Sequence, residues 1–205
     1  MTTASAAVQP AGLPVQPVHP KRGRGTAKWG MAVLIMTEAT IFAGLLGSYF
    51  FVRAESGEWP PPPIEAPELE AIALFSIILL GSSAPMVWAE HGIRKGQQWR
   101  LRLGLLLTFL MGTAFLCFQA VEYVELDFGI RDNAYGSLFY TITGLHGAHV
   151  LVGILMIFMI MVKAWMGKFS GERHLLVEMV GLYWHFVDAV WVFVFSSLYL
   201  AAHLK

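Results

Sequence analysis

Cysteine is almost absent from this chain: its 205 residues include one, Cys117. A single cysteine excludes a disulfide scaffold, a two-cysteine copper site, a C-x-x-C-H haem attachment and an iron–sulfur cluster. Charge is also scarce, at 14% of the residues, against roughly 25% in an average soluble domain. The 14 basic residues equal the 14 acidic ones. No basic excess exists to neutralise phosphates, so a nucleic-acid partner is excluded.

Apolar residues are abundant, and they fall into five long stretches. They make up 56% of the chain. A helix needs about 20 predominantly apolar residues to cross a bilayer. The sequence therefore predicts an all-α fold, an integral membrane bundle of five transmembrane helices at residues 30–52, 69–89, 101–121, 138–162 and 178–200. Pro85 predicts a kink in the second span, and short connections predict that consecutive spans are antiparallel neighbours.

The segments outside the spans have distinct characters. Residues 1–28 are rich in Ala, Thr, Pro and Gln, and no apolar stretch among them precedes a cleavage site. We therefore expect a disordered cytoplasmic tail rather than a cleaved signal peptide, followed by a membrane domain over residues 29–205. The four prolines after Trp59 cannot continue a helix and predict an extended external connection.

Loop charge predicts the orientation of the bundle. Eleven of the 14 basic residues lie in the tail, the second–third loop and the fourth–fifth loop, and the other three are Arg53, Arg131 and Lys205. Lys and Arg are enriched in the cytoplasmic loops of membrane proteins. The N-terminus is therefore predicted to be cytoplasmic and the C-terminus external.

Five ionisable residues lie well inside the predicted spans: Glu38, His146, His149, His185 and Asp188. Such groups are costly in a bilayer and usually face protein and form pairs. Counted at 1.5 Å per residue from the predicted ends, Glu38 matches His185 in depth, and Asp188 matches His149. We expect the three histidines and Asp188 to form an interhelical polar cluster between the fourth and fifth spans. Glu122, near the end of the third span, is expected to snorkel to the membrane surface.

Three interpretations of these residues remain open: structural hydrogen bonds, haem ligation in an electron carrier, and a proton relay in a small transporter. His149 and His185 differ by about 10 Å in depth, which suits one porphyrin poorly. No compact set of three or four metal ligands is present, and the paired repeats of many transporters are absent. Small residues four apart predict close helix contacts, namely Gly104/Thr108/Gly112, Ala43/Gly47, Gly44/Ser48 and Gly144/Ala148.

Several long motifs resemble subunit III of the haem-copper respiratory oxidases in its five-helix form. The first span carries Trp29-Gly30-Met31, Thr37-Glu38 and Phe42, and the third ends in Gln119-Ala120-Val121-Glu122-Tyr123. The most specific runs are Thr143-Gly144-Leu145-His146-Gly147-Ala148-His149-Val150 and Tyr183-Trp184-His185-Phe186-Val187-Asp188-Ala189-Val190-Trp191. The Trp59-to-Pro63 loop resembles the bacterial cytochrome c oxidase branch.

The resemblance implies an accessory subunit without a catalytic residue, metal or redox cofactor of its own. Haem and copper are expected in partner subunits, with catalytic subunit I as the main contact, and with subunit II, other oxidase subunits and membrane lipids, including bound phospholipid, as further partners. The implied location is a bacterial inner membrane. The implied role is to stabilise subunit I and support proton uptake while the complex passes electrons to oxygen and pumps protons. Seven-helix members add two N-terminal helices and a lipid-filled cleft, neither of which is expected here. A quinol oxidase or nitric oxide reductase complex could use a similar subunit.

Overall fold

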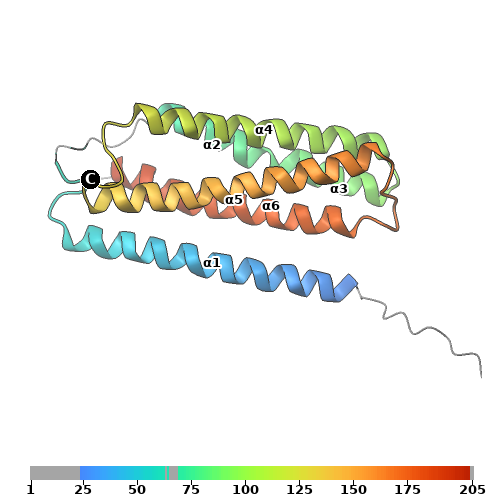
Figure 1. Cartoon of the computed structure of the whole chain (residues 1–205), viewed down its shortest axis with the longest axis horizontal. Helices are drawn as coiled ribbons and strands as arrows, with labels where there is room; N and C mark the ends of the chain where they lie inside the picture. Colours follow the sequence, from blue (N-terminus) through green and yellow to red (C-terminus); the bar gives the residue numbers. More distant parts are fainter. Residues whose placement is uncertain (1–23, 63, 65–68, 204–205) are drawn as a thin grey trace, which may run out of the picture.

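The computed structural model describes residues 24–62, 64 and 69–203, and this part of the chain contains helices and no strand. The elements are α1 (Arg24–Glu55), α2 (Leu69–Gly81), α3 (Ser83–Arg94), α4 (Gln98–Glu125), α5 (Ala134–Trp165), α6 (Leu175–Phe195), the π-helical turn η1 (Ser196–Leu200) and α7 (Ala201–His203). With α2 joined to α3, and α6 to η1, five helical segments are long and apolar enough to cross a membrane. The predicted all-α, five-span architecture is confirmed (Figure 1).

The helices extend beyond the predicted spans at most of their ends. α1 begins at Arg24, so residues 24–28 belong to a helix and not to the predicted tail; residues 1–23 lie outside the described part. α5 begins earlier than predicted because the Asn133 side chain accepts a hydrogen bond from the Gly136 N–H and caps the first turn. The extra turns carry charged and aromatic residues, which hydropathy alone assigns to loops.

The second span is interrupted between α2 and α3. Pro85 lies in the first turn of α3, but the break falls at Ser82. A proline ring clashes with the carbonyl of the residue four positions earlier, here Gly81. The predicted kink is therefore present, and it lies almost one turn before the proline that causes it.

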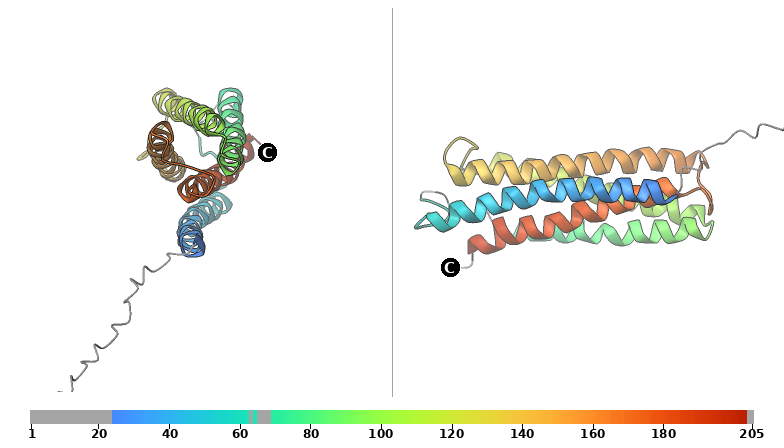
Figure 2. Two further views of the ribbon diagram at one scale, coloured as in Figure 1. Left: turned by 90° about the vertical axis from the view of Figure 1, so that its right-hand side faces the viewer. Right: turned by 90° about the horizontal axis from the view of Figure 1, so that it is seen from below.

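Four of the five spans enclose one core, and α1 packs on its outside against α5 and α6. Figure 2 shows this arrangement along the bundle axis. Trp184 and Trp191 of α6 are fully buried in the core. The Trp184 ring fits between two glycines, because a Cβ would lie 2.5 Å from it on Gly112 and 2.7 Å from it on Gly153. These glycines let α4 and α5 approach α6 closely.

The small-residue stripes of α4 and α1 differ, because the first packs closely against its neighbours and the second does not. On α4, a Cβ on Gly104 would lie 2.6 Å from the Pro85 carbonyl oxygen, and Thr108 donates a hydrogen bond to the Ser82 carbonyl. On α1, a Cβ on Gly44 or Gly47 would meet nothing within 4 Å. The expectation for α1 is wrong within this chain, because α1 meets the bundle through a different face that includes Phe42 and Tyr49.

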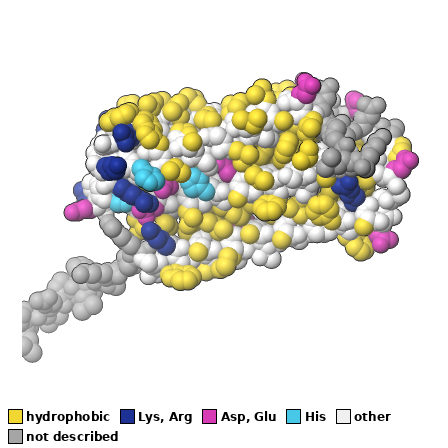
Figure 3. All heavy atoms as spheres, turned by 180° about the vertical axis from the view of Figure 1, so that it is seen from behind, with side chains coloured by type: hydrophobic (Ala, Val, Ile, Leu, Met, Phe, Trp, Pro, Cys, Tyr) yellow, Lys and Arg dark blue, Asp and Glu magenta, His cyan; other side chains and the backbone are white. Residues whose placement is uncertain are grey.

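Charge collects at the ends of the bundle. We call the end where α1, α4 and α6 begin and α3 and α5 finish the basic end, because it holds Lys28, Arg94, Lys163, Lys168 and Arg173. Figure 3 shows most of the Lys and Arg side chains and the His side chains toward one end of the visible face, acidic side chains at both ends, and apolar side chains along its length. This distribution is that of a bundle with lipid around its middle.

Candidate functional site

The buried ionisable residues do not form one cluster. The structure divides the five into Glu38 with His149 between α1 and α5, His185 with Asp188 on α6, where Ser83 of α3 completes a triad, and an isolated His146. The predicted cluster between the fourth and fifth spans is therefore wrong. Both depth-based pairs are also wrong, because neither Glu38 with His185 nor Asp188 with His149 is in hydrogen-bond contact.

The first group joins the peripheral helix α1 to α5. Glu38 Oε2 lies 3.0 Å from His149 Nε2, and His149 Nδ1 lies 2.8 Å from the Leu145 carbonyl oxygen. A carbonyl can only accept, so Nδ1 carries a hydrogen. The contact at Nε2 then needs one more hydrogen, held either by the carboxyl group or by the imidazole. One hydrogen bond therefore joins Glu38 and His149 near the middle of the bundle.

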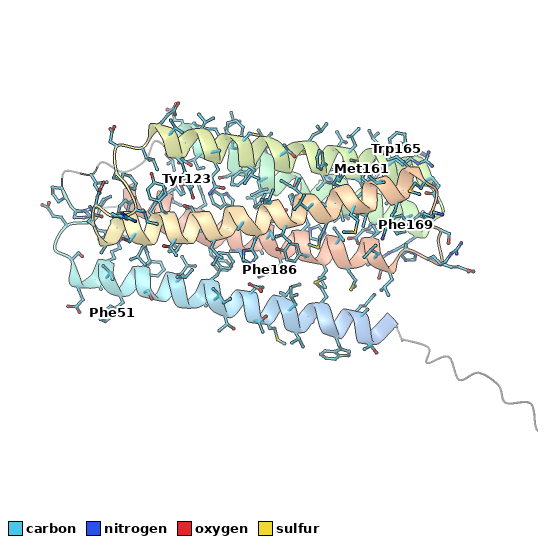
Figure 4. All side chains as sticks on the ribbon, in the orientation of Figure 1. Phe51, Tyr123, Met161, Trp165, Phe169 and Phe186 are labelled. Carbon is cyan, nitrogen blue, oxygen red and sulfur yellow. The ribbon has the colours of Figure 1, made fainter. Side chains whose placement is uncertain are left out.

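Glu38 is hydrogen-bonded, as the cost of burying an acid predicts, but it is less enclosed than expected. Its side chain is 30% exposed, whereas that of His149 is 13% exposed. The partial exposure follows from the position of α1 outside the other helices. Figure 4 shows that Phe51, about one turn before the end of the same helix, points away from the bundle.

The second group is a hydrogen-bonded triad of Ser83, His185 and Asp188. Ser83 Oγ lies 2.8 Å from His185 Nδ1 and donates to Asp188 Oδ2 at 2.5 Å. His185 and Asp188 are three residues apart on α6, so both face α3, where Ser83 begins the helix. The sequence analysis missed Ser83. A serine in an apolar run usually bonds to its own helix, as Ser76 does to the Ile72 carbonyl.

His146 stands apart from both groups. It is fully buried, and neither ring nitrogen has a hydrogen-bond partner in the described residues. Aromatic rings surround it instead: Trp191 has its ring centre 4.7 Å away, Phe115 6.1 Å and Phe42 6.4 Å. His146 therefore acts as a core aromatic ring between α5, α6, α4 and α1.

Glu122 is buried, so its predicted snorkelling is wrong. α4 continues to Glu125, which places Glu122 a turn inside the helix, 9% exposed. Tyr199 of η1 donates a hydrogen bond to Glu122 Oε2 at 3.3 Å. The nearby Gln119, which the sequence analysis names in a motif without giving it a role, donates to the Thr143 carbonyl at 2.9 Å. A glutamine inside an apolar span was the available signal.

Tyr123 adds a second link between α4 and α5 at this far end. Its hydroxyl lies 2.7 Å from Thr143 Oγ1, and its ring lies between the two helices in Figure 4. Together with Glu122 and Gln119, it makes the far end of the bundle interior polar. The middle of the interior, around His146, is aromatic.

An ion network closes the basic end. Glu178 on α6 accepts from Lys28 of α1 at 2.9 Å, from Arg94 of α3 at 3.1 Å and from His174 at 3.1 Å. Glu90 lies 3.7 Å from Arg94. A cavity of about 250 Å³ opens beside these groups, lined by Lys28, Glu90, Arg94, Glu178, Met179, Leu182 and His185. The network links three helices and leads toward the Ser83 triad.

The described residues contain no group of three or more His, Cys, Asp or Glu arranged to hold a metal ion. The arrangement is instead one of paired and relayed hydrogen bonds between helices. Such an arrangement can hold helices in register and can pass protons, and both properties suit a multi-pass helical membrane protein.

Comparison with known proteins places this membrane bundle in a family. Residues 14–203 match the family model described as cytochrome c oxidase subunit III. A cytochrome c oxidase subunit 3 of Thermostichus vulcanus is 34% identical over 172 residues, covering 83% of this chain and 85% of the relative. Proteins of that name in Arabidopsis thaliana and Mus musculus are 35% and 34% identical over 178 residues, covering 84% of this chain and 67% and 68% of theirs. The chain belongs to the cytochrome c oxidase subunit III family.

Proposed function

We propose that this chain is the accessory subunit III of a cytochrome c oxidase-type complex, in contact with catalytic subunit I. The match to the family over residues 14–203 carries the proposal. The complex passes electrons to oxygen and pumps protons in aerobic electron transport, so this chain is part of a proton-pumping translocase. Its own part is to stabilise subunit I during turnover and to support proton uptake from the cytoplasmic side.

The absence of a redox centre in this chain is part of the proposal. Haem ligation requires an imidazole nitrogen that is free to face a porphyrin. Both ring nitrogens of His149 are engaged, and Nδ1 of His185 is held by Ser83. Nε2 of His185 has no hydrogen bond in the described residues, but the cavity of about 250 Å³ that His185 lines is bordered by the charged side chains of Lys28, Glu90, Arg94 and Glu178. His146 is enclosed by aromatic rings. These contacts favour a structural and proton-handling role over electron transfer.

Purification of the native complex tests the assignment. An affinity tag on this chain, followed by extraction in mild detergent, should recover the haem- and copper-bearing subunits together with their reduced-minus-oxidised absorption spectrum. Reduced cytochrome c, and not quinol, should drive oxygen consumption by the preparation. Recovery of this chain alone would overturn the proposal. A Soret band from the separated chain would favour an electron carrier, and solute uptake by the chain in liposomes would favour a transporter.

The proposed location is a bacterial inner membrane, with the basic end in the cytoplasm. The eleven-to-three division of basic residues between the two sets of segments that flank the spans in the sequence supports this orientation. Gln97, between α3 and α4, and Asn133, before α5, lie at opposite ends of the bundle. Reporter fusions at these residues should give cytoplasmic and external signals, respectively. Signals from the same side at both positions would contradict the topology.

A further inference from the structure

Ser83 lies between two titratable side chains of the neighbouring helix α6. Its Oγ atom lies 2.8 Å from His185 Nδ1 and 2.5 Å from Asp188 Oδ2. Asp188 is 5% exposed, and its other carboxyl oxygen is buried without a hydrogen-bond partner among the described residues. An ionised carboxylate would therefore have a single donor in this place, which is a poor environment for a buried charge.

The opposite side of the triad reaches a polar cavity. His185 lines the cavity of about 250 Å³ at the basic end, and its Nε2 makes no hydrogen bond within the described part of the chain. A water molecule occupies about 30 Å³ in the liquid and needs two or more polar partners. The cavity has the volume for several, and it provides charged partners on three helices: Lys28 on α1, Glu90 and Arg94 on α3, and Glu178 on α6.

We propose that Asp188 is a proton-exchanging carboxyl group, supplied from this cavity through His185 and Ser83. The proton donor and acceptor on the cavity side is water. A proton carried by hydronium in the cavity binds His185 Nε2 and leaves neutral water, and the hydrogen on His185 Nδ1 moves to Ser83 Oγ. The hydroxyl hydrogen of Ser83 moves to Asp188 Oδ2. One proton enters at Nε2, one arrives at the carboxylate, and His185 and Ser83 end neutral.

The two hydrogen bonds of the triad are present both before and after this transfer. With Asp188 ionised, His185 Nδ1–H donates to Ser83 Oγ and the Ser83 hydroxyl donates to the carboxylate. With Asp188 protonated, its O–H donates to Ser83 Oγ and the Ser83 hydroxyl donates to the bare Nδ1. A hydroxyl both donates and accepts, so no ring has to turn and no member loses its partner. Ser83 is the positioning residue that makes the two states equivalent in hydrogen bonding.

The other titratable groups near the triad belong to the cavity and not to the relay. The ion network places Lys28, Glu90, Arg94 and Glu178 at the basic end. The pair of Glu38 and His149 contacts α6 through the Tyr183 hydroxyl, which donates to the His149 carbonyl, and shares no hydrogen bond with Ser83 or Asp188. The triad therefore exchanges protons separately from the α1–α5 pair.

Infrared spectroscopy of the detergent-solubilised complex tests the proposal. A protonated Asp188 gives a carbonyl-stretch band that shifts when the complex is transferred to D₂O, and Asp188→Asn should remove that band. Ser83→Ala should slow the shift by about tenfold or more, since the relay is broken, and Ser83→Thr should restore it. Ser48→Ala is the matched control, because the Ser48 hydroxyl bonds only the Gly44 carbonyl of its own helix; it should leave the rate unchanged.

Three results would overturn the proposal. These are no Asp188-dependent band at any pH at which the complex is intact, a band that does not exchange in the unmodified complex, or the unmodified rate in Ser83→Ala. If Ser83→Ala prevents assembly, His185→Phe breaks the relay from the other member and should slow the shift as well. The measurement follows one carboxyl group, so its result does not depend on the electron donor or the partner subunits of the complex.

Discussion

The two helices α1 and α6 cross the same membrane but are held in different ways. In the apolar 18-residue window of each span, 6% of the residues are buried in α1, whereas 56% are buried in the span that contains α6. α6 places Trp184 and Trp191 in the centre of the core, whereas α1 turns large apolar residues such as Trp29 and Phe51 outward. Figure 2 shows α1 outside the ring that the other spans form.

Polar contacts at three depths attach α1. Lys28 meets Glu178 near its start, Glu38 meets His149 near its middle, and Arg53 donates to the Ala201 carbonyl at 2.9 Å near its end. Apolar surface gains little by moving from lipid to another helix, so association in a membrane depends on close packing and on hydrogen bonds. α6 is held mainly by packing and α1 mainly by hydrogen bonds. Substitutions that disturb packing should therefore destabilise α6 strongly, whereas α1 should respond mainly to the loss of polar contacts.

The largest effect should come from removing the Trp184 ring. Trp184→Ala opens a cavity between α4 and α5. It also removes the hydrogen bond that the indole Nε1 of Trp184 donates to Ser82 Oγ at 2.8 Å. Large-to-small core substitutions of this kind cost about 3–5 kcal/mol. This cost is measured by heating the purified complex and monitoring the loss of this chain from it. Trp29→Ala, at a residue 73% exposed, is the control; equal losses from both would show that α6 packing is not decisive.

The second effect concerns the glycines beside that ring. Gly112→Ala and Gly153→Ala place a methyl group 2.5 Å and 2.7 Å from Trp184, and overpacking of this kind costs about 1–3 kcal/mol. On α1, Gly44→Ala and Gly47→Ala meet open space and should be neutral or slightly stabilising, because alanine favours a helix by up to about 1 kcal/mol over glycine. The same thermal assay should give opposite signs for the two pairs, and matching signs would contradict the model of two attachment modes.

The sequence predicts the helices far better than their side-chain partners. Length and hydropathy locate five spans, and Pro85 locates the break in the second to within a turn. The pairing of buried residues by depth fails because the predicted spans are shorter than the helices by different lengths at different ends. Glu38 lies 14 residues from the observed start of α1 and His149 lies 16 residues from the observed end of α5, about 21 and 24 Å. These depths match, whereas those counted from the predicted ends do not.

Rotation about the helix axis is the other quantity that depth omits. His146 and His149 are three residues apart, yet one faces aromatic rings and the other faces Glu38. The run from Thr143 to Val150 does not reveal which side chains each histidine contacts, because those side chains belong to helices distant in the sequence. Ser83 is missed for the same reason: its role depends on α6 lying opposite.

A smaller effect is expected at the middle attachment of α1. Glu38→Gln should retain this chain in the complex, because the amide can donate to the bare Nε2 that His149 presents when its Nδ1–H bonds Leu145. Glu38→Leu removes the bond, and interhelical hydrogen bonds in membranes contribute about 0.6 kcal/mol on average and up to about 1.7. Retention in detergent should fall for Leu alone, with haem per subunit I constant. Thr40→Val, whose hydroxyl bonds only the Met36 carbonyl, is the control.

Equal retention of Glu38→Gln and Glu38→Leu would remove the hydrogen-bond argument. A loss of haem in proportion to the loss of the pair would replace the structural interpretation with an electron-carrier one. The Thr40→Val control separates these outcomes from a general effect of substituting polar residues on α1.

The smallest effect should come from the ion pair at the start of α1. Lys28 is 54% exposed at its side chain, and surface ion pairs contribute about 0–1 kcal/mol and are screened by salt. Glu178 keeps Arg94 and His174 as partners when Lys28 is changed, so Lys28→Gln should lower retention slightly, and only at low ionic strength. Glu178→Gln weakens three contacts at once and should cost more. A salt titration of retention measures both. If Lys28→Gln released this chain as strongly as Trp184→Ala does, at high salt as well as low, α1 would not be held by separable polar contacts and the contrast with α6 would fail.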